Sequence, residues 1–263
     1  MNSESRTPTS AQVIAAIARR EITLAMRRRL VKLLFLGNLL PPLVMGVILV
    51  VNTLVRGAGI ENLEWDPLAR LLQIQIAPVL FLALGIGTPL VARDRREDVL
   101  FLYATRPVTP WSYTAGKMLA VAVPALALLV IPAILIAILR MGLKADFGLL
   151  DSITLITKVV LVAVLVACGY SGVSVGPSAA TKKARWALLL ALMCFVIPSV
   201  ASDIIWGHHG YALDPGQASE DVISALFDND NVSQGVVGAF ALVVWGVLGS
   251  FVTATRIRRE MIP

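Results

Sequence analysis

Charged residues are scarce in this chain: they make up 15% of its 263 residues, whereas a soluble domain carries about a quarter. Hydrophobic residues make up 57%, and the mean hydropathy is +0.79. This composition argues against a soluble enzyme. It is typical of an integral membrane protein.

Cysteine and histidine are nearly absent, with two of each in the chain. Cys168 and Cys194 lie inside apolar runs, which excludes a disulfide framework and is typical of small buried hydrophobic residues. His208 and His209 are adjacent, so their side chains point apart and rarely share one ion, and no third ligand stands at a recognisable spacing. We therefore expect this chain to bind no metal and no other cofactor.

The chain has no phosphate-binding loop of the Walker type, so any ATP-driven activity would need that chemistry from another protein. Ionisable residues are also nearly absent from the long apolar runs. Transporters coupled to protons or ions keep carboxylates or histidines at membrane depth, so we do not expect that class. The chain itself is not expected to be an enzyme.

Long apolar runs are what the chain has in abundance. Each run is near the twenty residues that a helix needs to cross the hydrocarbon of a membrane. Prolines lie within five of the runs, where neighbouring groups must satisfy the backbone bonds that they remove. The predicted spans cover residues 33–55, 71–92, 118–139, 153–175, 186–206 and 234–255.

The positive charges are distributed unevenly about these six spans. An even number of spans places both chain ends on one side, and 18 of the 23 Lys and Arg residues fall on that side. Connections rich in Lys and Arg stay in the cytosol. The sequence therefore predicts a multi-pass protein of the cell inner (plasma) membrane with both termini cytosolic.

The N-terminal segment predicts a surface helix. Residues 1–10 are polar and predict a disordered tail, whereas residues 11–30 have the period of an amphipathic helix that lies in the membrane interface. Glu21 projects onto the apolar side, and three interpretations of it remain open: local pairing with Arg28, solvation among alanines, or contact with a partner protein. The apolar side consists of Val13, Ile14, Ile17, Ala18, Leu24 and Ala25.

The longest outer loop, residues 207–233, contains no Lys or Arg. Asp214, Pro215 and Gln217 have the pattern of a helix start, with Asp214 as the N-cap and the proline at the first position. The sequence predicts a short amphipathic helix after them, resting on the rim of the bundle or re-entering it. Its apolar side would contain Val222, Ile223, Leu226 and Phe227.

A Gly-x-Ser-Gly sequence ends at Gly172 in the fourth span and resembles the nucleophile motif of rhomboid-like intramembrane serine proteases. That chemistry needs a histidine base in the sixth span, and residues 234–255 contain none. Ser171 also lies in the cytosolic half of its span, whereas the rhomboid serine lies toward the outside. Close helix packing is the favoured interpretation, through Gly169, Gly172 and Gly176.

Residues 93–117 form a charged island between the second and third spans. We predict a short cytosolic helix over residues 93–106, with acid from Asp94 to Glu97 at its N-terminus, where the helix dipole favours negative charge. Residues 107–117 would form a rigid turn into the third span. An amphipathic helix of this kind fits a groove on a cytosolic partner, and a solvated loop is the alternative.

The string D-R-R-x-x-x-L-x-L-Y-x-x-R-P-V-x-x-x-x-Y-x-x-G-K, over residues 94–117, resembles the loop after the second span in permease subunits of type-2 ABC exporters. Those subunits also have an amphipathic N-terminal helix in which a basic residue is followed directly by a glutamate, and Arg20 and Glu21 match this pair. The family has a basic or polar residue where this chain has Pro110. The likeness covers the layout of nearly the whole chain, and its residue detail is confined to these two stretches.

The resemblance implies one all-α permease domain over residues 11–263, with a coupling helix at residues 93–106. Two cytosolic ABC ATPase subunits would bind ATP and magnesium, and a second permease subunit, as in a homodimer, would complete the transporter within membrane lipid. Nucleic acid is not expected as a partner. The function implied is export, or assembly of a membrane machine, driven by ATP hydrolysis in the partner.

The residues expected to contact the ATPase follow from the same resemblance. The alternatives to a permease are a rhomboid-like protease and a membrane scaffold that transports nothing. The expected contacts are Asp94, Arg95, Arg96, Glu97, Leu100, Tyr103 and Arg106, with Glu21 and Arg28 second.

Overall fold

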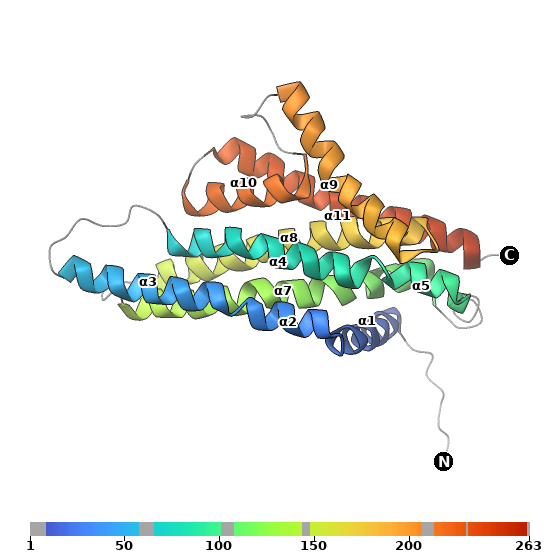
Figure 1. The fold of residues 1–263 in the computed structure, drawn as a ribbon, viewed down its shortest axis with the longest axis horizontal. Coiled ribbons are helices and arrows are strands. Elements are labelled where there is room, and N and C mark those ends of the chain that lie inside the picture. The colour runs from blue at the N-terminus through green and yellow to red at the C-terminus, as the bar shows by residue number, and fades with distance from the viewer. Residues whose placement is uncertain are drawn as a thin grey trace, which may run out of the picture.

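All regular elements that the computed structural model describes are helices, and they form an elongated bundle (Figure 1). Helix α1 and the end of the last helix, α11, lie at one end of it, beside α5. We call this the α5 end. The described residues are 9–57, 66–100, 108–143, 148–206, 213–229 and 231–261.

Six stretches are long and apolar enough to cross a membrane, which confirms the predicted all-helical membrane fold with six candidate spans. Each begins or ends within a few residues of the predicted run, and most extend beyond it. The stretches are Arg29–Val55, Pro67–Arg96, Pro110–Leu143, Leu149–Ala180, Ala184–Ser202 and Val232–Met261.

The first helix, α1 (Ser10–Met26), is amphipathic as predicted. A capping box formed by Thr9 and Gln12 starts it, and the helix packs against the first turns of α7. Ile17, Ala18 and Ala25 are buried, and so is Glu21. Residues 1–8 of the predicted tail lie outside the described ranges.

The first span consists of two helices, α2 (Arg29–Gly37) and α3 (Leu40–Gly57), which meet at Asn38. Asn38 is buried, and its Nδ2 donates to the Leu128 carbonyl at 2.7 Å. Pro132 stands four residues after Leu128 and has no N–H, so that carbonyl lacks its ordinary helical donor. Asn38 supplies the missing donor and ties the first span to α7.

The second span bends between α4 (Pro67–Gly87) and α5 (Leu90–Arg96). Pro89 cannot donate to the Gly85 carbonyl, and Arg28 Nη1 donates to it instead at 2.9 Å. The first N–H groups of α5 are satisfied from α8: Ser178 Oγ accepts from Val91 and Ala92, both at 3.0 Å. Ser178 thus acts as an N-cap from a neighbouring helix.

The third span begins earlier than predicted, because α7 covers Pro110–Leu143. Thr109 Oγ1 accepts from the Ser112 N–H at 3.1 Å, and Pro110 takes the first helical position, where a proline is tolerated. The predicted rigid turn over residues 107–117 is therefore wrong from Pro110 onward, since those residues are helical. Lys117 consequently lies two turns inside the helix.

The fourth span, α8 (Leu149–Ala180), continues past Gly176 and Pro177, where the sequence predicts its end. It packs closely against α11 (Val232–Met261). A Cβ atom on Gly172 would lie 2.2 Å from the Trp245 carbonyl oxygen, and one on Gly249 would lie 2.2 Å from the Gly172 oxygen. The absence of side chains at these positions lets the two backbones touch.

The fifth span, α9 (Ala184–Trp206), is the most exposed of the six. It packs chiefly on α8 and leans away from the rest of the bundle in Figure 1. The short helix predicted in the outer loop is present as α10 (Pro215–Phe227), with Asp214 accepting from the Gln217 N–H at 2.9 Å.

Helix α10 packs along the first half of α11. A Cβ atom on Gly238 would lie 2.6 Å from the Ala218 oxygen, and Trp245 Nε1 donates to the Leu213 carbonyl at 2.9 Å. Trp245 stands near the middle of α11, so the start of α10 lies well inside the bundle rather than on its rim. At the other end of α10, Lys158 Nζ donates to the Leu226 carbonyl.

Replacing Gly172 with Ala tests the backbone contact between α8 and α11. The added methyl has no room beside the Trp245 oxygen, so we expect the helices to separate and the free energy of unfolding to fall by about 1–3 kcal/mol. The control is Gly142→Ala, where a Cβ meets nothing within 4 Å. Equal thermal stability of the two variants in detergent would contradict the packing.

Candidate functional site

Lys117 is fully buried in α7 at the α5 end of the bundle. Its Nζ lies 2.9 Å from Glu21 Oε1 and 2.6 Å from Asp94 Oδ2. Removing an ammonium group from water is costly unless opposite charges and hydrogen bonds surround it. Lys117 therefore draws α1, which carries Glu21, and α5, which carries Asp94, onto the same turn of α7.

Two further side chains complete this arrangement. Tyr113, one turn before Lys117, donates its hydroxyl to Asp94 Oδ2 at 2.8 Å, and Arg93 Nη2 lies 3.3 Å from Glu21 Oε2. Two carboxylates thus meet two cations, and the charges balance. We call Glu21, Arg93, Asp94, Tyr113 and Lys117 the ion cluster.

A close approach of α1 to α7 makes the ion cluster possible. A Cβ atom on Gly116 would lie 2.8 Å from Ile17 Cβ, so a larger residue at this position would push α1 away. Glu21 follows Ile17 by four residues and lies on the same face of α1. Gly116 thereby brings the Glu21 carboxylate within reach of Lys117, the next residue of α7.

Arg95, itself buried, makes a second link at this end. Its Nε lies 3.0 Å from each carboxylate oxygen of Glu260, its Nη2 lies 2.5 Å from Glu260 Oε1, and its Nη1 donates to the Ala179 carbonyl at 2.7 Å. Ala179 stands in the last turn of α8, where carbonyls lack helical partners. Arg95 therefore fastens the ends of α8 and α11 to α5.

Arg28 lies beside the ion cluster. Burial lowers the pKa of its guanidinium, the nearby Arg93 lowers that pKa further, and Glu21 raises it. Its bond to the Gly85 carbonyl connects the start of the first span to the bend between α4 and α5. The sequence offered Arg28 as a local partner for Glu21, whereas in the structure the Glu21 carboxylate forms ion pairs with Lys117 and Arg93.

The residues predicted to contact a partner fall into two groups. Glu21, Asp94 and Arg95 are each about 5% exposed and are engaged within the chain, and Leu100 is buried as well. Arg96 and Glu97 are exposed at the tip of the α5 end. Asp98 is exposed too. Tyr103 and Arg106 lie outside the described residues.

The helix predicted over residues 93–106 does not begin where expected. Asp94, Arg95 and Arg96 form the last turn of α5. The helix ends at Glu97, and Asp98 follows it with a positive φ of 52°. The acid therefore stands at a helix C-terminus, which the dipole disfavours. Contacts of Asp94 with Lys117 and Tyr113 compensate for this position.

Sequence reasoning missed four residues of this region as site residues: Arg93, Tyr113, Lys117 and Glu260. The sequence places Lys117 in a loop because it predicts that the third span begins at residue 118. Pro110 preceded by Thr109 is the signal that could have placed the helix start correctly. Glu260 carried no signal of its own, because it stands among the basic residues of the C-terminal tail.

The described residues give little support for a serine protease or for a metal site. Ser171 is buried, and its Oγ donates to the Cys168 carbonyl at 2.8 Å. The helix around it faces α11 through Gly169, Gly172 and Gly176. Within the described ranges no three His, Cys, Asp or Glu residues gather as a metal site. His208 and His209 lie outside those ranges.

Replacing Lys117 with Met tests the ion cluster. The variant leaves two buried carboxylates short of a cation, so we expect a loss of about 3–5 kcal/mol in the free energy of unfolding. Tyr113→Phe removes one hydrogen bond to a charged group and should cost about 1.5–3 kcal/mol. Denaturation in detergent measures both, and the exposed Lys32→Met is the control. Stability of Lys117→Met equal to that of the control would contradict the cluster.

Comparison of the chain with models of protein families gives no match, and comparison with curated proteins gives none either. The chemistry of the chain's own residues, and the way in which the fold brings them together, therefore carry any functional conclusion.

Proposed function

We propose that this chain is the membrane-spanning subunit of an ATP-driven ABC transporter, an exporter, and that the α5 end receives its ATPase. One observation carries the proposal. The two stretches that resemble type-2 ABC permeases, Arg20–Glu21 and residues 94–117, meet in the ion cluster, although Glu21 and Lys117 are 96 residues apart. The two stretches that carry the likeness are far apart in the sequence and lie together at one site in the fold.

The ion cluster suits the transfer of movement. Arg96 and Glu97 stand exposed at the tip of α5, where a cytosolic partner can reach them. A displacement of that tip acts on α7 through the bond between Asp94 and Lys117, and on α1 through Glu21. Because these contacts are buried, water does not compete for them, and the connected helices respond together.

The link through Arg95 extends this response to further helices. Arg95 connects the tip of α5 to Glu260 on α11 and to the last turn of α8. Movement at one exposed tip would therefore reach four of the six spans: the second, third, fourth and sixth. The fifth span, α9, has few contacts with α5 and none of these polar links.

The chemistry of ATP belongs to the partner in this proposal. Two ATPase subunits would hold ATP and magnesium, and a second permease subunit would complete the membrane-spanning part. The excess of Lys and Arg on the side of the chain termini supports a cytosolic position for the α5 end. Glu21, Asp94 and Arg95 then act as positioning residues behind the contact surface.

The double variant Arg96→Ala, Glu97→Ala tests the docking surface. Both side chains are exposed, so thermal stability should not change, whereas binding of the ATPase that co-purifies with the chain should weaken by about tenfold or more. Affinity is measured between the permease in nanodiscs and the isolated ATPase. Arg70→Ala, exposed at the opposite end of α4, is the matched control.

Three outcomes would contradict the proposal. The double variant could bind as tightly as Arg70→Ala, no ATPase could accompany the chain from its own membrane, or the purified chain could hydrolyse ATP alone. Turnover of a bound ATPase that responds to no candidate cargo would instead favour a scaffold that transports nothing.

A further inference from the structure

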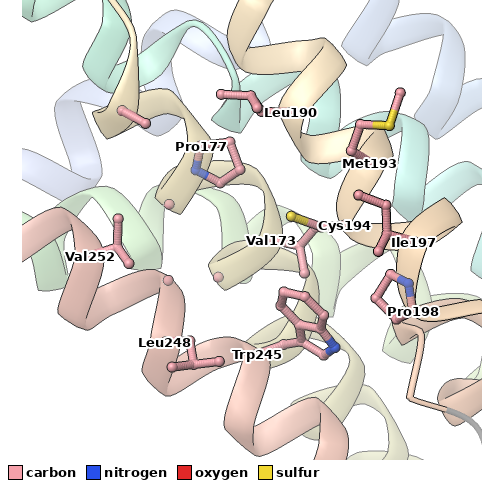
Figure 2. A pocket seen from close by; sticks show the side chains of 14 residues that line it. Val173, Pro177, Leu190, Met193, Cys194, Ile197, Pro198, Trp245, Leu248 and Val252 are labelled. Carbon is pink, nitrogen blue, oxygen red and sulfur yellow. The ribbon is translucent and has the colours of Figure 1, made fainter. Parts of the chain in front are cut away.

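A cleft of about 420 Å³ opens between α9 and the pair formed by α8 and α11. Figure 2 shows its walls. No charged residue lines it, and glycines of α8 and α11 form part of its floor. Apolar side chains from the three helices face the space, among them Val173, Pro177, Met193, Ile197, Leu248 and Val252.

The cleft is shorter than one leaflet of the membrane hydrocarbon is deep. Its lining runs from Gly172 to Ala180 on α8 and from Trp245 to Val252 on α11, which at 1.5 Å per residue is about 10–12 Å. One leaflet of hydrocarbon is about 15 Å deep, half of the 30 Å core. The cleft therefore lies within a single leaflet. A membrane-spanning helix of a second protein would need a groove that crosses both leaflets.

Basic residues surround one mouth of the cleft. Ala180, the last lining residue of α8, is followed by exposed Lys182 and Lys183 in the connection to α9 and by exposed Arg185 in the first turn of α9. Arg256 is exposed one turn beyond Val252, on the same face of α11. Among the described residues no ion pair engages any of these four side chains.

We propose that this cleft binds one acyl chain of an anionic phospholipid, whose headgroup phosphate rests between Arg256 and the α8–α9 connection. The apolar walls match the acyl chain, the length fits within one leaflet, and the basic residues at the mouth match the negative charge of the headgroup. A neutral phospholipid would gain the first two contacts without the third. The leaflet is that of the α5 end, and the proposal stands whether or not the chain is a permease.

Trp245 provides a reporter, because it lines the deep end of the cleft. A variant with Trp65, Trp111, Trp186 and Trp206 replaced by Phe leaves it as the single tryptophan. The protein is placed in phosphatidylcholine nanodiscs that contain increasing fractions of phosphatidylglycerol or phosphatidylcholine brominated on the acyl chain. Bromine quenches tryptophan fluorescence at short range, so quenching reports which lipid occupies the cleft.

We expect brominated phosphatidylglycerol to quench Trp245 saturably at a low mole fraction, where brominated phosphatidylcholine has little effect. Replacing Lys182, Lys183, Arg185 and Arg256 with Gln should weaken the apparent affinity for phosphatidylglycerol by about tenfold or more. The matched control replaces Arg27 and Lys32 with Gln. Both are exposed basic residues outside the cleft lining.

Equal quenching by the two lipids would overturn the proposal, since it would mean ordinary boundary lipid. Absence of quenching by either lipid, with the chain dimeric, would overturn it in favour of a second copy covering the cleft. If the single-tryptophan variant does not fold, native mass spectrometry of the unmodified chain decides instead. One retained phosphatidylglycerol, lost in the four-Gln variant, is the expected result, and retention unchanged in that variant would contradict the proposal.

Discussion

The arrangement of the helices at the α5 end depends on Lys117, a lysine that is fully buried. Once α7 begins at Pro110, its second turn carries Lys117 into the bundle, and opposite charges must come to it. Glu21 and Asp94 meet that need, which sets the position of α1 and the direction of α5. The arrangement of three helices thus follows from one buried charge and from the glycine beside it that lets α1 approach.

The same requirement applies to backbone groups that prolines leave without partners. Pro89 and Pro132 leave the carbonyls of Gly85 and Leu128 without helical donors. The side chains of Arg28, just before the first span, and Asn38, within it, donate to them. Together with Glu21, these bonds fasten α1 and the first span to α4 and α7 at three places. An end held in this way can pass a force to the spans instead of yielding locally.

Much of the fold could be predicted from the sequence, because six apolar runs are long enough to be recognised and Asp214 marks the start of α10. The polar contacts could not be predicted from the sequence, because each one depends on which helices lie next to each other in the fold. Glu21 gave only the signal of an acid on an apolar face, and its partner lies 96 residues away. The sequence predicts that Asp94 stands at the start of a helix, whereas in the structure α5 ends just after it. The end depends on the left-handed backbone of Asp98, which an aspartate adopts only occasionally, so the sequence did not reveal it.

The claim that buried charge binds α1 to α7 is tested most directly by a double-mutant cycle on Glu21 and Lys117. Glu21→Gln, Lys117→Met and the combined variant are compared with the unmodified chain in the free energy of unfolding. Residues in such contact show interaction energies of about 0.5–3 kcal/mol. We predict that the double variant is more stable than the sum of the single effects by at least about 1 kcal/mol. Additivity within about 0.3–0.5 kcal/mol, as for independent sites, would contradict the account.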